Sequence, residues 1–377
     1  MLVALLLGHT HINAGCSKLV GAGTFDNGHY NDDDHQMNVV DRFVPGTVPE
    51  RLWAEPYNTS YPDGTGPLMY AASDDRELVF LLLGDLELRS VVTVNITSGA
   101  STSVRAPPSA TWVFRIRPRG AGKPFHAVAT QLSACGTDPY GPLNCLNVSV
   151  GELSPQSGEF TAYRADVRFQ LQIGIGDFLF EAAPGNAESS LLMFQTIGKD
   201  GEGTIRTFAW EFGAATDRLV QMTACTRPGP EMARGRLFPS GPSKASQFVG
   251  LFLPDFEFEP PCPKAPCVAE WRATTFDGSR VSNDTMCPSE YPVSGDPLEN
   301  AMNVGSGWTL ATAVERSSAG DAVAVHAITT FQGFPHDYTN YLYRYDLAAG
   351  TSTRQPFVYR NSSLGVPYTD ILQAFCF

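Results

Sequence analysis

The stretch MNVVDRFVPG, residues 37–46, roughly alternates apolar and polar side chains and then reaches a proline-glycine pair. A period of two is the pattern of a half-buried β-strand, and Pro followed by Gly is typical of a turn. The same order of strand and turn recurs at intervals of roughly 60 residues, which indicates an internal repeat. The five further copies are SVVTVNI (90–96), LNVSVGEL (146–153), TIRTFAWEF (204–212), VAEWRATTF (268–276) and YLYRYDL (341–347).

Other predicted strands keep the same order around each copy. A more apolar run precedes every copy, and a shorter polar run follows most of them; ELVFLLLGD and STSVRAP flank the second copy in this way. A fourth run, such as TWVFRIRP or WTLATAV, lies still further ahead, although the fifth repeat shows it poorly, near 236–239. Inner strands that are buried on both faces form continuous apolar runs, so each repeat predicts a four-stranded sheet that grows more polar outward.

The two ends of the sequence complement each other. The first repeat lacks its innermost strand, while YTDILQAFCF at 368–377 is surplus to the sixth repeat. We therefore expect Tyr368–Phe375 to pair with Lys18–Phe25 and to complete the first sheet from both ends of the chain. Cys16 and Cys376 flank these two strands, so a disulfide between them is predicted to lock the closure.

Six four-stranded repeats with terminal closure resemble the β-propellers with six blades, at superfamily level. The sequence has no WD dipeptide, YWTD motif, kelch double glycine or sialidase-type Asp box that would indicate a particular family. The resemblance implies an all-β protein with one propeller domain over residues 17–377, preceded by a signal-like or apolar arm over residues 1–16. Tandem β-sandwiches are the alternative, because they also give regularly spaced strands.

The cysteines favour a disulfide framework over a metal site. The chain has eight cysteines and no paired C-x-x-C motifs, and its seven histidines are scattered. Cys135 and Cys145 share one predicted hairpin and are expected to pair. Cys262 with Cys267 and Cys225 with Cys287 are the further predicted pairs, with crossed pairing among those four left open.

Several features favour an extracellular location. Residues 1–16, MLVALLLGHTHINAGC, contain a short apolar run at Leu2–Leu7, although a positively charged start is missing. An even number of cysteines and five N-x-Ser/Thr sequons agree with secretion and N-linked glycans. The five predicted acceptor residues are Asn58, Asn95, Asn147, Asn283 and Asn361.

The charge balance bears on the possible partners. The formal net charge is −13, with 26 Lys and Arg against 39 Asp and Glu. This balance argues against nucleic acid as a partner, because phosphate binding needs clustered basic residues. No apolar run approaches the length of a transmembrane span.

One acidic residue follows the apolar second strand of every repeat. On a closed ring these residues would gather on one face, where a ring of carboxylates could attract Ca²⁺ as the only cofactor that the sequence suggests. The alternative is that each Asp turns the chain by accepting hydrogen bonds from nearby backbone amides. His126 and His326 lie in the same class of strand and are interpreted as core histidines. The six candidates are Asp26, Asp85, Asp138, Asp200, Asp255 and Asp337.

The sequence carries no signature of nucleophilic catalysis, so no catalytic residue is assigned. The first hypothesis is a secreted, glycosylated structural or interaction protein, such as a subunit of a fibre or coat. Its partners would be further copies of itself or other extracellular proteins, with Leu2–Leu7 adding a strand to a neighbouring copy. The alternatives are a calcium-dependent extracellular hydrolase or lactonase, and a glycan-binding lectin.

Overall fold

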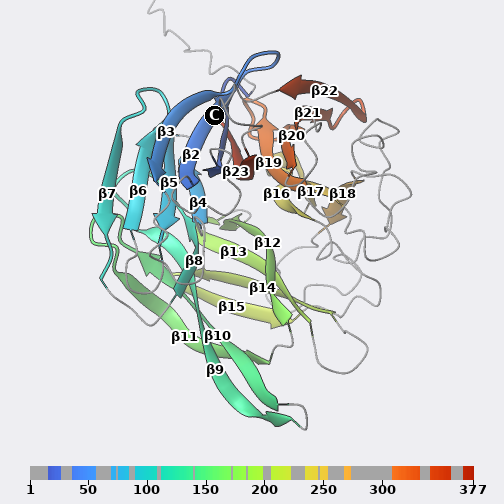
Figure 1. Cartoon of the computed structure of the whole chain (residues 1–377). Helices are drawn as coiled ribbons and strands as arrows, with labels where there is room; N and C mark the ends of the chain where they lie inside the picture. The colour runs from blue at the N-terminus through green and yellow to red at the C-terminus, as the bar shows by residue number, and fades with distance from the viewer. Residues whose placement is uncertain are drawn as a thin grey trace, which may run out of the picture.

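A computed structural model gives the structure of the chain (Figure 1). It describes residues 16–26, 36–56, 69–73, 75–84, 90–107, 112–138, 141–170, 173–183, 186–197, 205–221, 234–244, 247–253, 267–272, 308–331, 340–357 and 368–377. The described residues form antiparallel β-sheets and one short 3₁₀ turn, Pro242–Lys244. Among them, no helix is long and apolar enough to cross a membrane.

The strands form six sheets, which we number in chain order, and the first three have four strands each. In each case the strands are given from the innermost to the outermost. The first sheet is β23 (Tyr368–Cys376), β1 (Leu19–Asp26), β2 (Gln36–Phe43) and β3 (Glu50–Pro56). The second is β4 (Met69–Ser73), β5 (Leu78–Leu83), β6 (Ser90–Asn95) and β7 (Ser101–Arg105). The third is β8 (Trp112–Arg117), β9 (Phe125–Asp138), β10 (Gly141–Leu153) and β11 (Phe160–Gln170).

The other three sheets continue the same order. The fourth is β12 (Ile173–Ala183), β13 (Asn186–Ile197), β14 (Ile205–Gly213) and β15 (Thr216–Gln221). The fifth shows three strands within the described residues, namely β16 (Arg234–Pro239), β17 (Gln247–Leu253) and β18 (Cys267–Arg272). The sixth is β19 (Trp308–Arg316), β20 (Ala322–Phe331), β21 (Asn340–Asp346) and β22 (Thr351–Phe357).

The innermost strands connect the sheets into one ring. Strand β4 contacts β8, β8 contacts β12, β12 contacts β16, β16 contacts β19, and β19 contacts β23. Side chains of the first and second sheets, among them Phe375 and Tyr70, pack in one buried cluster and close the ring. This arrangement is that of a β-propeller, as the repeat predicts, with five complete four-stranded blades and the three-stranded fifth sheet. Tandem sandwiches would instead pack the sheets in separate pairs.

The first sheet is completed by both ends of the chain, as predicted. Strands β1 and β23 pair antiparallel from Leu19 opposite Cys376 to Asp26 opposite Tyr368, with a register shift between Ala22 and Gly23. Gly21 lies where the first and sixth sheets meet, and a Cβ there would approach Ile371 to 2.7 Å and Phe43 to 2.8 Å. Glycine is therefore required by this close approach of neighbouring side chains.

Apolar side chains between neighbouring sheets form the core. The aromatic residues Phe180, Phe194 and Trp210 of the fourth sheet pack on Val128 and other residues of the third. These rings are essentially inaccessible to water. Burial of large apolar side chains contributes roughly 1.5–3 kcal/mol each, so the faces between blades supply most of the stabilisation.

The hairpin of β9 and β10 is longer than its counterparts in the other sheets. Strand β9 has 14 residues and β10 has 13, against 8 each for β1 and β2. In Figure 1 this hairpin extends past the body of the ring at the bottom of the view. The repeat pattern did not predict this extension.

Candidate functional site

A cavity of about 420 Å³ lies where the innermost strands end, and we call it the channel mouth. The residues that line it come from the innermost strand of all six sheets and from the turns that follow some of them. Polar and charged side chains line it together with apolar ones. Those used below are Arg117, Glu181 and Arg316.

The two arginines of the channel mouth hold neighbouring sheets together. Arg117 of the third sheet donates to the carbonyl oxygens of Ala187 and Ser189 in the fourth, at 3.3 and 3.1 Å. Arg316 of the sixth sheet donates to the carbonyl oxygen of Pro239 in the fifth at 3.0 Å. Burial lowers the pKa of Arg117 to about 10, while the nearby carboxylate of Glu181 acts to raise it. These cations therefore have a structural role, because their donors meet main-chain acceptors between blades.

A buried serine–histidine pair lies beside Arg117. The Ser190 Oγ atom is 2.7 Å from His126 Nδ1 and accepts a hydrogen bond from Arg117 Nε, also at 2.7 Å. Because the arginine Nε can only donate, the Ser190 hydroxyl is free to donate to His126, which fits a neutral imidazole. Both His126 and Ser190 are fully buried, so this pair is closed to a substrate.

The environment of His126 opposes its protonation. Burial lowers its pKa to about 3, and the positive charges of Arg119 and Arg117 act in the same direction. Its ring lies edge-on to Tyr163 and tilted on Phe212, with centroids 5.8 and 5.3 Å apart. The interpretation of His126 as a core histidine is confirmed, and its contacts join the third and fourth sheets.

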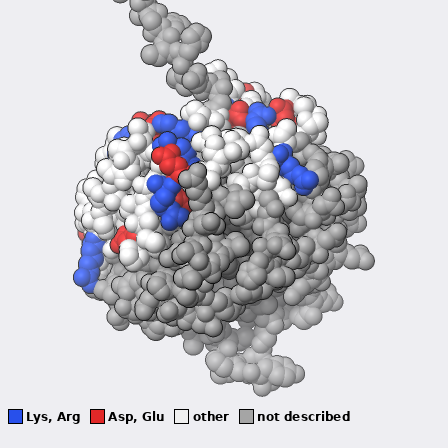
Figure 2. Space-filling model, turned by 45° about the horizontal axis from the view of Figure 1, so that its top comes forward, with Lys and Arg blue, Asp and Glu red and all other residues white. Residues whose placement is uncertain are grey.

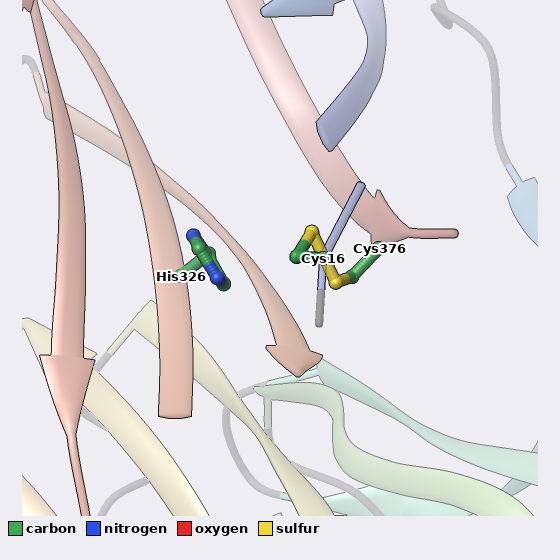
Figure 3. Close-up of side chains that lie close together, drawn as sticks. All are labelled: Cys16, His326 and Cys376. Atoms are coloured by element: carbon green, nitrogen blue, oxygen red, sulfur yellow. A yellow bond between two sulfur atoms is a disulfide. The ribbon is translucent and has the colours of Figure 1, made fainter. Parts of the chain in front are cut away.

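The second cluster is the clasp, which we define as Cys16, Cys376, His326 and Glu315. Figure 3 shows the first three of these residues. Cys16 and Cys376 form a disulfide with their Cα atoms 5.2 Å apart, as the terminal strands predict. The sulfur atoms of Cys16 and Cys376 and a ring nitrogen of His326 all lie within 4.8 Å of one another. The clasp adjoins a cavity of about 240 Å³ between the first and sixth sheets, lined in part by Cys16 and His326.

Glu315 and Arg344 fix the position of His326. The His326 Nε2 atom is 2.8 Å from Glu315 Oε2, and Arg344 Nε donates to the same oxygen at 2.9 Å. Burial lowers the pKa of His326, although the Glu315 carboxylate acts to raise it. Burial also acts to raise the pKa of Glu315, but hydrogen bonds from Arg344 and His326 outweigh it and the pKa lies below its usual value. His326 is thus a partly buried histidine with a carboxylate partner.

The predicted carboxylate ring can be followed only in part. Asp85, Asp200, Asp255 and Asp337 lie outside the described residues, and only the backbones of Asp26 and Asp138 are described. Asp26 is seven residues past Leu19, and Asp138 is thirteen past Phe125, each counted from the start of its strand. At about 3.3 Å per residue, Asp138 lies roughly 20 Å further along its own strand than Asp26 does along its strand. The side chains of all six candidates lie outside the described residues, so the proposed Ca²⁺ site stays a prediction.

Of the remaining predicted disulfides, only the Cys135–Cys145 pair has a described side chain, that of Cys145. Cys145 is buried and disulfide-bonded. The backbone of Cys135 lies in β9, beside the register shift opposite Leu143 and Asn144, but its side chain is outside the described set. The side chains of Cys225, Cys262, Cys267 and Cys287 are also outside it, so their pairing stays a prediction.

Two of the five sequons fall in described strands. The Asn95 Oδ1 atom accepts hydrogen bonds from the backbone amides of Thr97 and Ser98 in the exposed turn between β6 and β7. Asn147 lies in the central strand β10, where its Nδ2 donates to Ser133 Oγ at 3.3 Å and its Oδ1 is buried. A glycan is attached through Nδ2, so Asn95 is the more suitable acceptor of the two. Asn58, Asn283 and Asn361 lie outside the described residues.

Sequence reasoning missed the channel mouth because it searched the opposite face of the ring. Neighbouring strands of each sheet run in opposite directions. The innermost strand therefore ends on one face of the ring, and the second strand ends on the other face. The predicted Asp residues follow the second strands, whereas the channel mouth lies where the innermost strands end. The sequence feature that could have located the channel mouth is an arginine at the end of two predicted innermost strands, in FRIRPRG (114–120) and AVERSS (313–318).

No family model matches the chain, and no curated protein matches it. Solved structures similar to it include TolB from Acinetobacter baumannii, at 12% identity and TM-score 0.44, over 94% of this chain and 67% of that one. A chain of a nidogen/laminin complex aligns at 11% identity and TM-score 0.41, over 95% and 97% of the two chains. A putative 6-phosphogluconolactonase from Bacteroides uniformis aligns at 12% identity and TM-score 0.39, over 94% and 97%.

Proposed function

We propose that this propeller is a secreted structural or interaction protein that assembles with further copies of itself by strand addition. The clasp supports the compartment, because structural disulfides persist mainly in oxidising environments. In the proposed contact, Leu2–Leu7 of one copy pairs with the free edge of β7 in the next.

Among the described residues no strand pairs with the outer edge of β7, and this is the single observation that carries the proposal. Asn95 N donates to the carbonyl oxygen of Ala100 at 2.9 Å, so Asn95 and Ala100 form a hydrogen-bonded pair. Hydrogen-bonded and non-hydrogen-bonded pairs alternate along antiparallel strands. The backbone N–H and C=O groups of Ser101, Ser103 and Arg105 therefore point away from β6. Strand β7 is exposed at four of its five positions. Unpaired backbone groups on such an edge are a template for an added strand.

Other outer strands are better protected against strand addition. Strand β22 contains Pro356, and β3 carries Glu50, Arg51 and Glu55 and ends at Pro56. Strand β11 has a register shift and a left-handed residue, Asp166, with φ of 58°. Proline, charge and bulges are the usual means of blocking an edge, so β7 is a better acceptor than these three strands.

The surface of the described residues also agrees with a protein partner. Figure 2 shows basic and acidic side chains next to one another on this face rather than gathered by sign. Lys18 pairs with Glu77 at 2.6 Å, and Arg42 pairs with Glu50 at 3.1 Å. A head-to-tail contact of this kind extends into a filament when the rotation between successive copies does not close a ring.

Sedimentation velocity at rising concentration tests the assembly. We expect the full chain to form oligomers and a chain of residues 16–377 to remain monomeric. Ser103→Pro removes one outward N–H without removing a hydrogen bond of the sheet, and it is expected to reduce association at least tenfold. Ser103→Ala keeps that N–H and serves as the matched control. A full chain that sediments as a monomer at high concentration contradicts the proposal.

A further inference from the structure

Three residues with metal-binding side chains meet at the clasp from separate parts of the sequence. Cys16 directly precedes β1, Cys376 ends β23, and His326 lies in β20 of the neighbouring sheet. Their ligand-type atoms lie within 4.8 Å of one another, and Figure 3 shows His326 facing the two sulfur atoms. Two cysteines and a histidine are a donor set that Zn²⁺ prefers.

The surroundings of His326 have the form that orients a metal ligand. Its Nε2 atom is engaged by the Glu315 carboxylate at 2.8 Å, and Arg344 in turn holds that carboxylate at 2.9 Å. The carboxylate fixes the imidazole through Nε2. Within the described part of the chain Nδ1 makes no hydrogen bond, so it is the nitrogen left for a ligand. Histidines that bind metals almost always give their other ring nitrogen to such a partner.

We propose that Cys16, Cys376 and His326 form a Zn²⁺ site when the disulfide is reduced, so that the metal closes the ring in place of the sulfur–sulfur bond. Zinc binds thiolate at about 2.3 Å and imidazole nitrogen at about 2.0–2.1 Å, so tetrahedral ligand atoms lie roughly 3.3–3.8 Å apart. The observed span of 4.8 Å or less requires only small side-chain movements. A water molecule from the adjoining cavity of about 240 Å³ supplies the fourth ligand.

The chemistry balances with a dithiol as the reductant. The dithiol gives two electrons and two protons to the disulfide, which becomes two thiols, and is itself oxidised to a disulfide. Binding of Zn²⁺ then releases the two thiol protons to solvent, because the thiolate is the ligand. The same residues thus hold β1 and β23 together under both oxidising and reducing conditions.

Zinc analysis of the reduced full chain tests the proposal. The protein is reduced without oxygen, equilibrated with Zn²⁺, freed of loosely bound metal and analysed for zinc. The Cys16→Ser, Cys376→Ser double variant is treated identically, which subtracts zinc held by the other six cysteines. We expect the wild-type chain to retain one more equivalent of zinc than the double variant.

Co²⁺ in place of zinc reports the ligands directly. We expect a thiolate-to-cobalt charge-transfer band in the wild-type protein that is weaker in the double variant. His326→Ala keeps the disulfide, so it can be purified folded before reduction, and it is expected to lower metal affinity at least tenfold. Glu315→Gln is expected to lower it roughly tenfold through loss of the orienting carboxylate. Thr353→Ala, at an exposed position that lines the same cavity, is the matched control and leaves affinity unchanged.

Thermal unfolding of the reduced protein adds a readout of ring closure. We expect a higher melting temperature in Zn²⁺ than in a chelator for the wild type, and no difference for His326→Ala. Equal zinc content in the wild type and the double variant overturns the proposal. So does unchanged metal affinity in His326→Ala, or reduced wild-type protein that unfolds identically with and without zinc.

Discussion

The neutral, buried His126 predicts a specific loss of stability in acid. Its pKa is lowered from 6.5 to about 3, so between these values the unfolded chain binds a proton that the folded protein does not. Its contribution to stability is therefore complete above pH 6.5 and falls as the pH drops toward 3. With roughly 1.4 kcal/mol for each pKa unit, the whole loss is up to about 5 kcal/mol.

Between pH 7 and pH 5, His126 alone accounts for about 2 kcal/mol of lost unfolding free energy. The assay is urea unfolding at both values, comparing the wild type with His126→Gln. We expect the variant to be about 1–3 kcal/mol less stable at pH 7, because hydrogen bonding and packing around Ser190 are disturbed. Its further loss at pH 5 should be about 2 kcal/mol smaller than that of the wild type.

Ser190→Ala separates the hydrogen bond from the titration. This variant loses the hydroxyl that contacts His126 but keeps the histidine, so it should retain the wild-type difference between pH 7 and pH 5. Equal pH dependence in the wild type and His126→Gln would refute the assignment of a neutral His126. Loss of the pH dependence in Ser190→Ala would contradict the assignment of the lowered His126 pKa to burial rather than to the contact with Ser190.

Two further predictions concern the clasp and the sequons. Cys376→Ser removes a disulfide that spans 360 residues of sequence. The relation between loop length and chain entropy gives a loss of unfolding free energy of up to about 6 kcal/mol, measured by urea unfolding under oxidising conditions. A loss below about 1 kcal/mol contradicts this prediction. In a secretory host we expect glycan at Asn95, which lies in an exposed turn, and none at Asn147, whose Nδ2 is engaged by Ser133. Before endoglycosidase treatment, Asn95→Gln should therefore migrate faster on electrophoresis than the wild type, whereas Asn147→Gln should not. The reverse result would contradict the inferred difference in accessibility between the two asparagines.

The strand repeat was predictable because it depends on local patterning. All six alternating copies are third strands of their sheets, from β2, which ends at Phe43 as predicted, to β21. The pairing of β1 with β23 was predictable by a different route, since a missing inner strand at one end matched a surplus strand at the other.

The candidate sites could not be predicted in the same way, because they depend on which strand ends share a face. Arg117 and Arg316 are 199 positions apart and meet neighbouring blades only in the closed ring. His326 reaches Cys16 and Cys376 across the boundary between two sheets. The extra length of β9 and β10 also separates Asp138 from the position that the repeat assigns to it.

The pairing of Leu19 with Cys376 also sets the timing of synthesis. At about 5–20 residues per second, the ribosome needs roughly 20–70 s to make the chain between these partners. During that interval β1 has no neighbour on its inner side, and a β23 strand released from a second nascent chain could occupy it. Such an exchange would produce a domain-swapped dimer with two complete rings, so crowded polysomes are the setting in which this protein is most exposed to misassembly.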